Sequence, residues 1–300
     1  MDIAELTLPR LREGFKSQSY IADDDIVVPV YLALKLGKPL LVEGAPGVGK
    51  TEIAKVLSGL FGFPLVRLQC YEGLDENKAL YEWNYQKQLI RIQIVKDRYD
   101  DTQHVEDEIF SDAFLLERPL LRAIRSPRRS VLLIDEVDRT DEQFEAFLFE
   151  VLSDFQVSIP EMGTLVARHI PIVVLTSNRS RELSDALKRR CLFLFIDYPS
   201  VEKETRILKA KVPEAGDKLA EQVAAAVHRM RSMDNLKKKP SIAESLDWTR
   251  GLLAMGASEL DAHAVRSTLN LVIKHKDDLS AVLEKGCLCS LMEASRRAER

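Results

Sequence analysis

The chain has 300 residues, of which 46% are hydrophobic, so it can form one large globular domain or two smaller ones with a buried core. Its net charge of −4 reflects nearly balanced acids and bases, which provides no general attraction to nucleic acid or to an anionic membrane. We expect a soluble, cytoplasmic protein with no membrane span, because the N-terminus lacks an apolar signal region, no apolar stretch approaches about 18 residues, and the 4 cysteines are too unevenly placed for a disulfide framework.

The first strong helical pattern follows a polar entry segment and the acidic cluster Asp23–Asp25. Asp25 can cap this helix, and apolar residues recur at helical spacing until Gly37 ends the pattern. The sequence therefore predicts a helix that precedes the segment described next.

The eight residues Gly44–Thr51, GAPGVGKT, match the phosphate-binding pattern GxxxxGK[ST] completely. The apolar run Pro39–Glu43 predicts a buried strand before them, and residues 52–57 predict an amphipathic helix after them. The glycines allow backbone N–H groups to close around phosphate oxygens, and the start of the helix adds its positive end. We expect Lys50 to reach the β and γ phosphates and the Thr51 hydroxyl to bind Mg²⁺. The alternative interpretation is a glycine-rich turn without a ligand.

The next elements complete a βαβ unit, because glycines and Pro64 break the chain before a second short strand at residues 65–70. A parallel sheet of this kind binds ligands at the carboxyl ends of its strands. Residues 81–96 are predicted to form an inserted β-hairpin, because isoleucines alternate with polar residues there. Trp83 could contact a partner, but packing on the domain is favoured. A solvated acidic loop at 97–108 and a helix at 111–126 should follow.

Residues 131–136, VLLIDE, combine four aliphatic residues with two acids. A buried strand that ends in this way beside a phosphate loop provides one carboxylate for the Mg²⁺ shell and another for the attacking water. We assign Asp135 to the metal and Glu136 to the water. Acids after a strand also occur as helix caps, and Asp138 or Asp141 is a candidate for that role.

A helix is predicted at residues 140–155 and a second hairpin at 155–171, before a strand that ends in Asn178. The Asn178 amide could bind the attacking water or the γ phosphate. A short helix then ends in Lys188–Arg190 before a fifth strand. Basic residues in a last turn usually stabilise the helix dipole, and the sharper interpretation is an arginine finger that enters a neighbouring subunit's nucleotide site.

Only helical patterns occur beyond Pro199, so we predict an α/β core at residues 1–199, with a five-stranded parallel sheet between helices, and an all-helical lid domain at 200–300. The run Lys237–Pro240 reads as a solvated loop. Cys287 and Cys289 could bind a soft metal, but two thiolates are too few for a closed site.

Four motifs in this order, GAPGVGKT, LLIDEVD, VLTSN and LKRRC, together with the helical region resemble an AAA+ ATPase over nearly the whole chain. The segment 141–159 and the two expected hairpins are similar to the MoxR branch of these proteins. The phrases LQCYEGLDENKALYEWNY and SIAESLDWTR look most like the CoxD type of MoxR protein.

The resemblance implies an ATP-driven remodelling ATPase with ATP and Mg²⁺ as cofactors, assembled as a homo-oligomeric, hexameric ring. It also implies a partner with a von Willebrand factor A domain and a metalloenzyme client, since the CoxD type is associated with maturation of molybdenum hydroxylases such as carbon monoxide dehydrogenase. Two alternatives remain. A nucleotide-dependent binding module without turnover is disfavoured by the intact Lys50, Asp135 and Glu136, and a nucleic-acid motor is disfavoured by the charge balance.

Carried onto this chain, the resemblance places Walker A at Gly44–Thr51, Walker B at Asp135 and Glu136, and sensor 1 at Asn178. The family commonly has Ser-Pro-Arg near the start of a lid helix, whereas this chain reads Ser-Leu-Asp-Trp-Thr-Arg, so Arg250 is the candidate for sensor 2. The expected catalytic residues are Glu136, Asn178, Arg190 as the arginine finger and Arg189 as its second candidate. The expected metal ligands are Thr51 and Asp135. The expected nucleotide contacts are Gly44, Ala45, Pro46, Gly47, Val48, Gly49, Lys50, Thr51, Glu52, Ile21, Ala22, Asp135 and Arg250.

Overall fold

A computed structural model of the protein describes residues 3–95, 108–284, 289, 291, 293 and 294. The chain divides into two compact units. The sheet unit comprises Met1–Leu11, Asp24–Glu43 and Thr51–Phe195. The helical unit comprises Arg12–Asp23, Gly44–Lys50 and Ile196–Arg300, so the phosphate loop is grouped with the helices of the C-terminal region.

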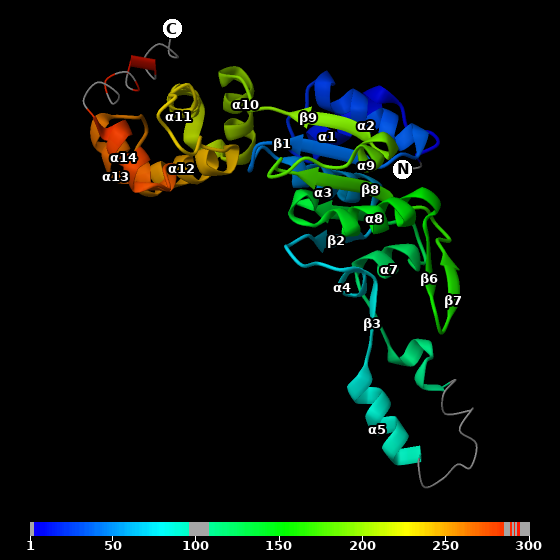
Figure 1. The fold of residues 1–300 in the computed structure, drawn as a ribbon. Helices are drawn as coiled ribbons and strands as arrows, with labels where there is room; N and C mark the ends of the chain where they lie inside the picture. The colour runs from blue at the N-terminus through cyan, green and yellow to red at the C-terminus, as the bar shows by residue number, and fades with distance from the viewer. Residues whose placement is uncertain (1–2, 96–107, 285–288, 290, 292, 295–300) are drawn as a thin grey trace. The chain divides into compact units, whose positions relative to one another are not determined.

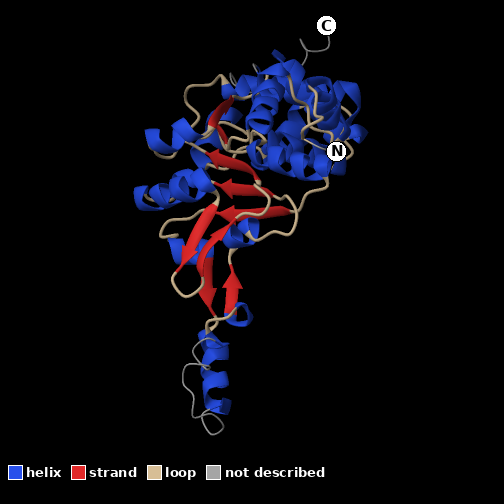
Figure 2. Ribbon diagram, turned by 90° about the vertical axis from the view of Figure 1, so that its right-hand side faces the viewer, coloured by secondary structure: helices blue, strands red, loops and turns tan. Residues whose placement is uncertain are grey.

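A five-stranded parallel sheet forms the centre of the sheet unit, in the order β2-β5-β8-β1-β9 (Figures 1 and 2). Its strands are β1 (Leu40–Gly44), β2 (Leu65–Gln69), β5 (Val131–Asp135), β8 (Ile172–Ser177) and β9 (Leu192–Ile196). Every residue of β1 and β5 is buried, as expected for central strands covered on both faces, whereas β2 alternates exposed and buried residues at the edge. The predicted α/β fold with a parallel sheet is confirmed.

Strand register places the ends of four strands at one edge of the sheet. Gln69 lies opposite Asp135, and Glu43 lies opposite Ser177, so β2 and β5 end together and β1 ends beside β8. Besides α5, described below, the helices in the described residues of this part of the chain are α1 (Leu8–Ser17), α2 (Asp24–Leu36), α3 (Lys50–Phe61), α4 (Glu76–Leu80), α7 (Pro119–Ile124), α8 (Glu142–Asp154) and α9 (Asp185–Arg190). Buried residues of α7 and α8 form one hydrophobic core with β2, β5 and β8.

The hairpin expected at residues 81–96 is wrong in its second half. β3 (Tyr81–Trp83) pairs in antiparallel fashion with β4 (Leu115–Glu117), while Tyr85–Val95 form helix α5, which extends away from the sheet in both views (Figures 1 and 2). Asn84 begins this helix, because its side chain accepts a hydrogen bond from the backbone N–H of Lys87. The alternating isoleucines misled the prediction, since they remain exposed on a helix.

Two polar residues of α5, Gln88 and Arg91, take its inward face. Gln88 is buried and donates to the Ile109 carbonyl at 2.7 Å, and Arg91 forms an ion pair with Glu108 at 2.7 Å. Residues three apart share one face of a helix, so Leu89 and Ile90 are left about 60% exposed.

The helix expected at 111–126 is interrupted. It is replaced by a 3₁₀ turn at Asp112–Phe114, then β4, then α7, whose first residue is Pro119. Proline fits the first position of a helix but cannot continue one, which separates α7 from the preceding strand. Trp83 is buried against the ring of Phe110, so the packing interpretation is confirmed for this residue.

The second inserted segment forms an antiparallel hairpin of β6 (Gln156–Ile159) and β7 (Gly163–Val166). It ends earlier than the expected residue 171. α8 stops before it because Phe155 adopts a left-handed conformation.

The helical unit contains α10 (Val201–Lys211), α11 (Gly216–Arg231), α12 (Ile242–Ala254), α13 (Ala262–Thr268) and α14 (Lys276–Leu283). Trp248 of α12 is fully buried in its core and donates to the Thr268 hydroxyl at 2.7 Å. The structure shows no strand in residues 200–284, in agreement with the predicted change from α/β to all-helical structure. No helix within the described part of the chain is long and apolar enough to cross a membrane.

Candidate nucleotide site

The phosphate loop has two positions that exclude any side chain. Gly47 has φ +73°, and a Cβ there would lie 2.6 Å from the side chain of Ser241. A Cβ at Gly44 would lie 2.1 Å from the carbonyl oxygen of Ile196. Glycine is therefore required at both positions by close packing, and by left-handed geometry at Gly47.

Lys50 lies over its own loop. Its ammonium group donates to the carbonyl oxygens of Gly44 at 2.8 Å and Ala45 at 2.7 Å, and the residue is only 6% exposed. Tyr20 donates from its hydroxyl to the Gly49 carbonyl at 3.4 Å. The residue just before Ile21 and Ala22 therefore contacts the phosphate loop.

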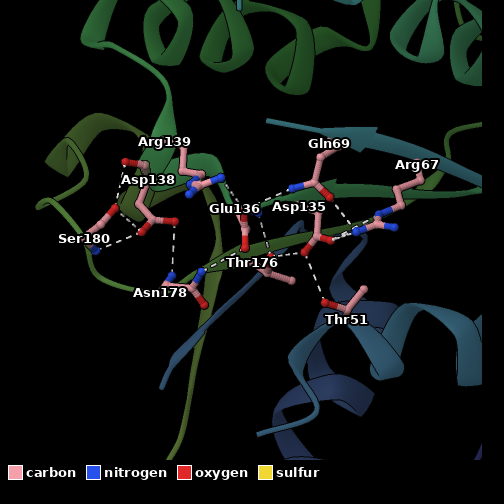
Figure 3. A network of polar contacts seen from close by, with 10 residues as sticks. All are labelled: Thr51, Arg67, Gln69, Asp135, Glu136, Asp138, Arg139, Thr176, Asn178 and Ser180. Carbon is pink, nitrogen blue, oxygen red and sulfur yellow. Dashed lines mark hydrogen bonds and ion pairs between the residues drawn. The ribbon is translucent and has the colours of Figure 1, made fainter. Parts of the chain in front are cut away.

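Asp135 is held at the end of β5 by three side chains from different elements (Figure 3). The hydroxyl of Thr51 donates to its Oδ1 at 3.1 Å, and that of Thr176 donates to the same atom at 2.5 Å. Arg67 donates to Oδ2 through Nε at 3.1 Å and through Nη2 at 2.5 Å. The two predicted metal ligands, Thr51 and Asp135, are thus in direct contact.

Glu136 follows in a left-handed conformation, with φ 58° and ψ 49°. Such geometry is uncommon for a residue with a side chain and often occurs at functional positions. Its carboxylate accepts from the amide of Asn178 at 3.2 Å and from that of Gln69 at 3.2 Å, and it also pairs with Arg139 at 3.3 Å (Figure 3). The structure therefore brings the predicted Walker B glutamate and the predicted sensor 1 asparagine together.

Asp138 positions the Asn178 loop. Its carboxylate accepts from the backbone N–H of Asn178 at 3.1 Å, from that of Ser180 at 2.8 Å and from the Ser180 hydroxyl at 2.6 Å. Although burial alone would raise it, these hydrogen bonds lower the pKa of Asp138 below the ordinary aspartate value. Of the two candidate helix caps, Asp141 is the cap, because its side chain accepts from the Phe144 N–H at 2.8 Å.

The basic residues of the prediction make other contacts. Arg189 and Arg190 are exposed at the end of α9, where the Arg190 guanidinium lies 4.8 Å from the centre of the Phe149 ring. Arg250 is exposed and pairs with Asp247 at 3.4 Å. It lies nine residues beyond Ser241, which is about 13 Å along α12 at 1.5 Å per residue. Glu52 forms an exposed pair with Lys55 at 3.0 Å.

Sequence reasoning missed the roles of Arg67, Thr176 and Ser180. Thr176 carried a usable signal, because it is a polar residue inside an apolar strand and lies two positions before Asn178, on the same face. Arg67 and Ser180 carried none, since their contacts depend on which strands become neighbours.

The cysteines provide no metal centre in the described residues, where no group of three potential His, Cys, Asp or Glu ligands occurs. Burial, with a smaller contribution from Asp135, raises the pKa of Cys70 to about 12, and burial raises that of Cys191 to about 12. Both thiols therefore stay protonated at neutral pH. Cys289 is exposed and free, and Cys287 lies outside the described residues.

The parallel sheet, the phosphate loop and the acids at the ends of its strands define a P-loop protein with an AAA+ core. The sequence profile of the AAA domain (dynein-related subfamily) matches residues 39–191. The chain belongs to this family.

Similar proteins do not define a task for this chain. Uncharacterized proteins of Staphylococcus aureus (strain USA300) and Staphylococcus haemolyticus (strain JCSC1435) are 25% and 22% identical, over 73% and 79% of this chain and 76% and 84% of theirs. A RuvB mutant of Thermotoga maritima is similar in structure, with a TM-score of 0.50 at 17% identity over 98% of this chain and 84% of that one. At this identity the likeness shows the fold alone.

Proposed function

We propose that this protein hydrolyses ATP and uses the energy to remodel a client protein. The observation that carries the proposal is the contact network at the strand ends, where Thr51 meets Asp135 and Glu136 meets Asn178. Thr51 follows Lys50 directly, so one peptide bond joins this network to the phosphate loop. A structural ion-pair cluster alone would not require a complete phosphate-binding sequence at that junction.

Each residue has a distinct role in this proposal. The loop backbone and Lys50 bind the phosphates, and Glu136 orients and deprotonates the attacking water, with Asn178 holding the Glu136 carboxylate. Thr51 and Asp135 fit Mg²⁺, because both offer hard oxygen donors and already lie 3.1 Å apart. Bound Mg²⁺ would neutralise negative charge on the β and γ phosphate oxygens.

The proposal extends to a homo-oligomeric, hexameric ring, since AAA+ proteins commonly form oligomeric rings. In such a ring Arg190, with Arg189 as the second candidate, acts as the arginine finger for the neighbouring subunit. The exposure of both side chains at the end of α9 supports this role.

The finer assignment is a MoxR protein of the CoxD type, located in the cytoplasm and acting in maturation of a molybdenum hydroxylase with a von Willebrand factor A partner. Its support is the sequence resemblance at LQCYEGLDENKALYEWNY and SIAESLDWTR. The division into a core at 1–199 and a lid at 200–300 belongs to the same proposal, as do nucleotide contacts from Ile21 and Ala22.

The Glu136→Gln variant tests the central step. It removes the base but keeps the shape and the hydrogen bond to Asn178, so ATP binding should persist while turnover falls by about 10² to 10⁴. Steady-state phosphate release and equilibrium ATP binding measure the two quantities. Glu150→Gln, an exposed glutamate on α8, is the matched control and should leave both unchanged. Normal turnover by Glu136→Gln would remove Glu136 from this role.

A further inference from the structure

The helical unit contains a cavity of about 340 Å³ that borders the phosphate loop. One wall is formed by Pro46 and Gly47 of that loop. The other walls are Tyr198, Ser241 and residues 236–239. We call residues 236–241, which connect α11 to α12, the lysine loop, because it contains Lys237, Lys238 and Lys239.

Buried charged residues hold the lysine loop from two sides. Asp278, only 1% exposed, accepts from the backbone N–H of Lys237 at 3.1 Å and from that of Lys238 at 3.2 Å. Arg231, 6% exposed, donates to the Pro240 carbonyl at 2.7 Å and lies over the Tyr198 ring at 4.7 Å. The backbone of this loop is therefore fixed by groups that are removed from water.

The three lysines differ in their ion pairs. Lys237 pairs with Asp277 at 2.6 Å, and Lys238 pairs with Glu244 at 3.3 Å. Lys239 has no ion-pair partner among the residues that the structure describes, and it lines the cavity beside Gly47. A fixed loop thus presents one ammonium group whose charge is not neutralised, next to a backbone suited to bind phosphate.

We propose that Lys239 binds the phosphate chain of the nucleotide held by the phosphate loop, and that Asp278 positions it by holding the lysine loop. This inference rests on the proposed nucleotide binding. Lys239 takes the role for which the sequence suggested Arg250, because Arg250 pairs with Asp247 and lies about 13 Å further along α12. The first turn of that helix carries Glu244, whose carboxylate completes a capping box with Ser241.

The test measures the affinity of ATP and of inorganic tripolyphosphate by competition against a fluorescent ATP analogue. Lys239→Gln should weaken both ligands about tenfold, as expected for a charge-assisted contact to phosphate, and Lys239→Arg should restore most of the affinity. Lys274→Gln is the control, because this exposed lysine of the same unit bonds, within the described part of the chain, only to the Asn270 carbonyl, and it should leave both affinities unchanged. Circular dichroism melting confirms that each variant folds.

The other possible results would contradict the role of Lys239 or the proposed nucleotide binding. If Lys239→Gln binds both ligands as the wild type does, the lysine loop is only a solvated surface. If ATP alone weakens, the contact is not to phosphate. If the wild-type protein binds neither ligand, the proposed function fails, and this inference fails with it.

The positioning role of Asp278 has its own readout. Asp278→Asn should weaken ATP binding in the wild-type background and have no further effect when combined with Lys239→Gln, because its influence passes through Lys239. A merely structural role of Asp278 would weaken binding equally in both backgrounds and would contradict the assignment.

Discussion

At the scale of single residues, Glu136 concentrates the local strain and the polar contacts of the site. Its left-handed backbone directs the carboxylate toward Asn178 and Gln69, while its backbone N–H donates to the Thr176 hydroxyl at 2.9 Å. Thr176 also donates to Asp135, so one threonine of β8 fixes both adjacent acids. This arrangement supports the proposed separation of the two carboxylates into a metal ligand, Asp135, and a base for the attacking water, Glu136.

Asp138 provides a prediction at the same scale. Asp138→Asn keeps an acceptor for Asn178 but loses a charge-assisted acceptor for Ser180, so the free energy of unfolding should fall by about 1–3 kcal/mol at pH 7. Because the pKa of Asp138 is lowered in the folded state, its stabilisation is fully present above the ordinary aspartate pKa and disappears as the pH falls through the lowered value. Urea unfolding of both proteins from pH 7 to pH 3 should show their difference shrinking with acid.

The control for this prediction is Asp141→Asn. Asparagine caps helices about as well as aspartate, so stability at pH 7 should change little. ATP turnover should fall in Asp138→Asn, because the loop that carries Asn178 loses its support. Unchanged stability at pH 7 in that variant would contradict the role given to Asp138.

At the scale of helices, a buried ion pair organises the helical unit. Glu204 of α10 accepts from both terminal nitrogens of Arg231 on α11, at 2.5 and 2.9 Å, and also from the Ser245 hydroxyl of α12 at 2.7 Å. Three helices therefore meet at one carboxylate that is fully buried. Arg231 continues from this pair to the Pro240 carbonyl, which connects helix packing to the lysine loop.

Glu204→Gln is the corresponding prediction. It leaves the buried guanidinium of Arg231 without a counterion, so the free energy of unfolding should fall by about 3–5 kcal/mol. Thermal and urea unfolding measure the loss. Glu202→Gln, an exposed position on the same helix, should change stability by less than about 0.5 kcal/mol, and equal effects of the two substitutions would show that the buried pair contributes little.

At the scale of the whole molecule, the proposal requires a site completed by a second subunit. Arg190→Ala should retain ATP binding and lose about 10³- to 10⁵-fold in turnover, as for other arginines supplied in trans. Wild-type turnover per subunit should rise with protein concentration as rings assemble. Phosphate release measured against concentration tests both expectations.

Mixing two inactive variants gives a sharper test of this arrangement. A Glu136→Gln subunit still supplies Arg190 to a neighbouring Arg190→Ala subunit, whose own Glu136 is intact, so activity should return in the mixture. Arg189→Ala in the same experiment shows which arginine acts. Full turnover by Arg190→Ala alone, or no recovery on mixing, would contradict the shared site.

Local patterns in the sequence determined much of the site. Three features each occupy one short segment: the phosphate loop, the acids at the end of β5 and the asparagine after β8. Their chemistry can be predicted from that segment alone, because it does not depend on which other segments lie beside it. The all-helical character beyond Pro199 was equally local, because it depends on periodicity within each helix.

Only the tertiary structure decided the remaining features. The partners of Asp135, the anchoring of Ser180 and the pairing of β3 with β4 join residues about 30 to 85 positions apart, and sheet order selects those partners. The alternating residues of α5 were misread because exposure on a helix can mimic a strand pattern. The sequence of Lys237–Lys239 predicts only a solvated, charged loop, because it does not show which groups contact these residues. In the structure, Asp278 and Arg231 hold this loop beside Gly47.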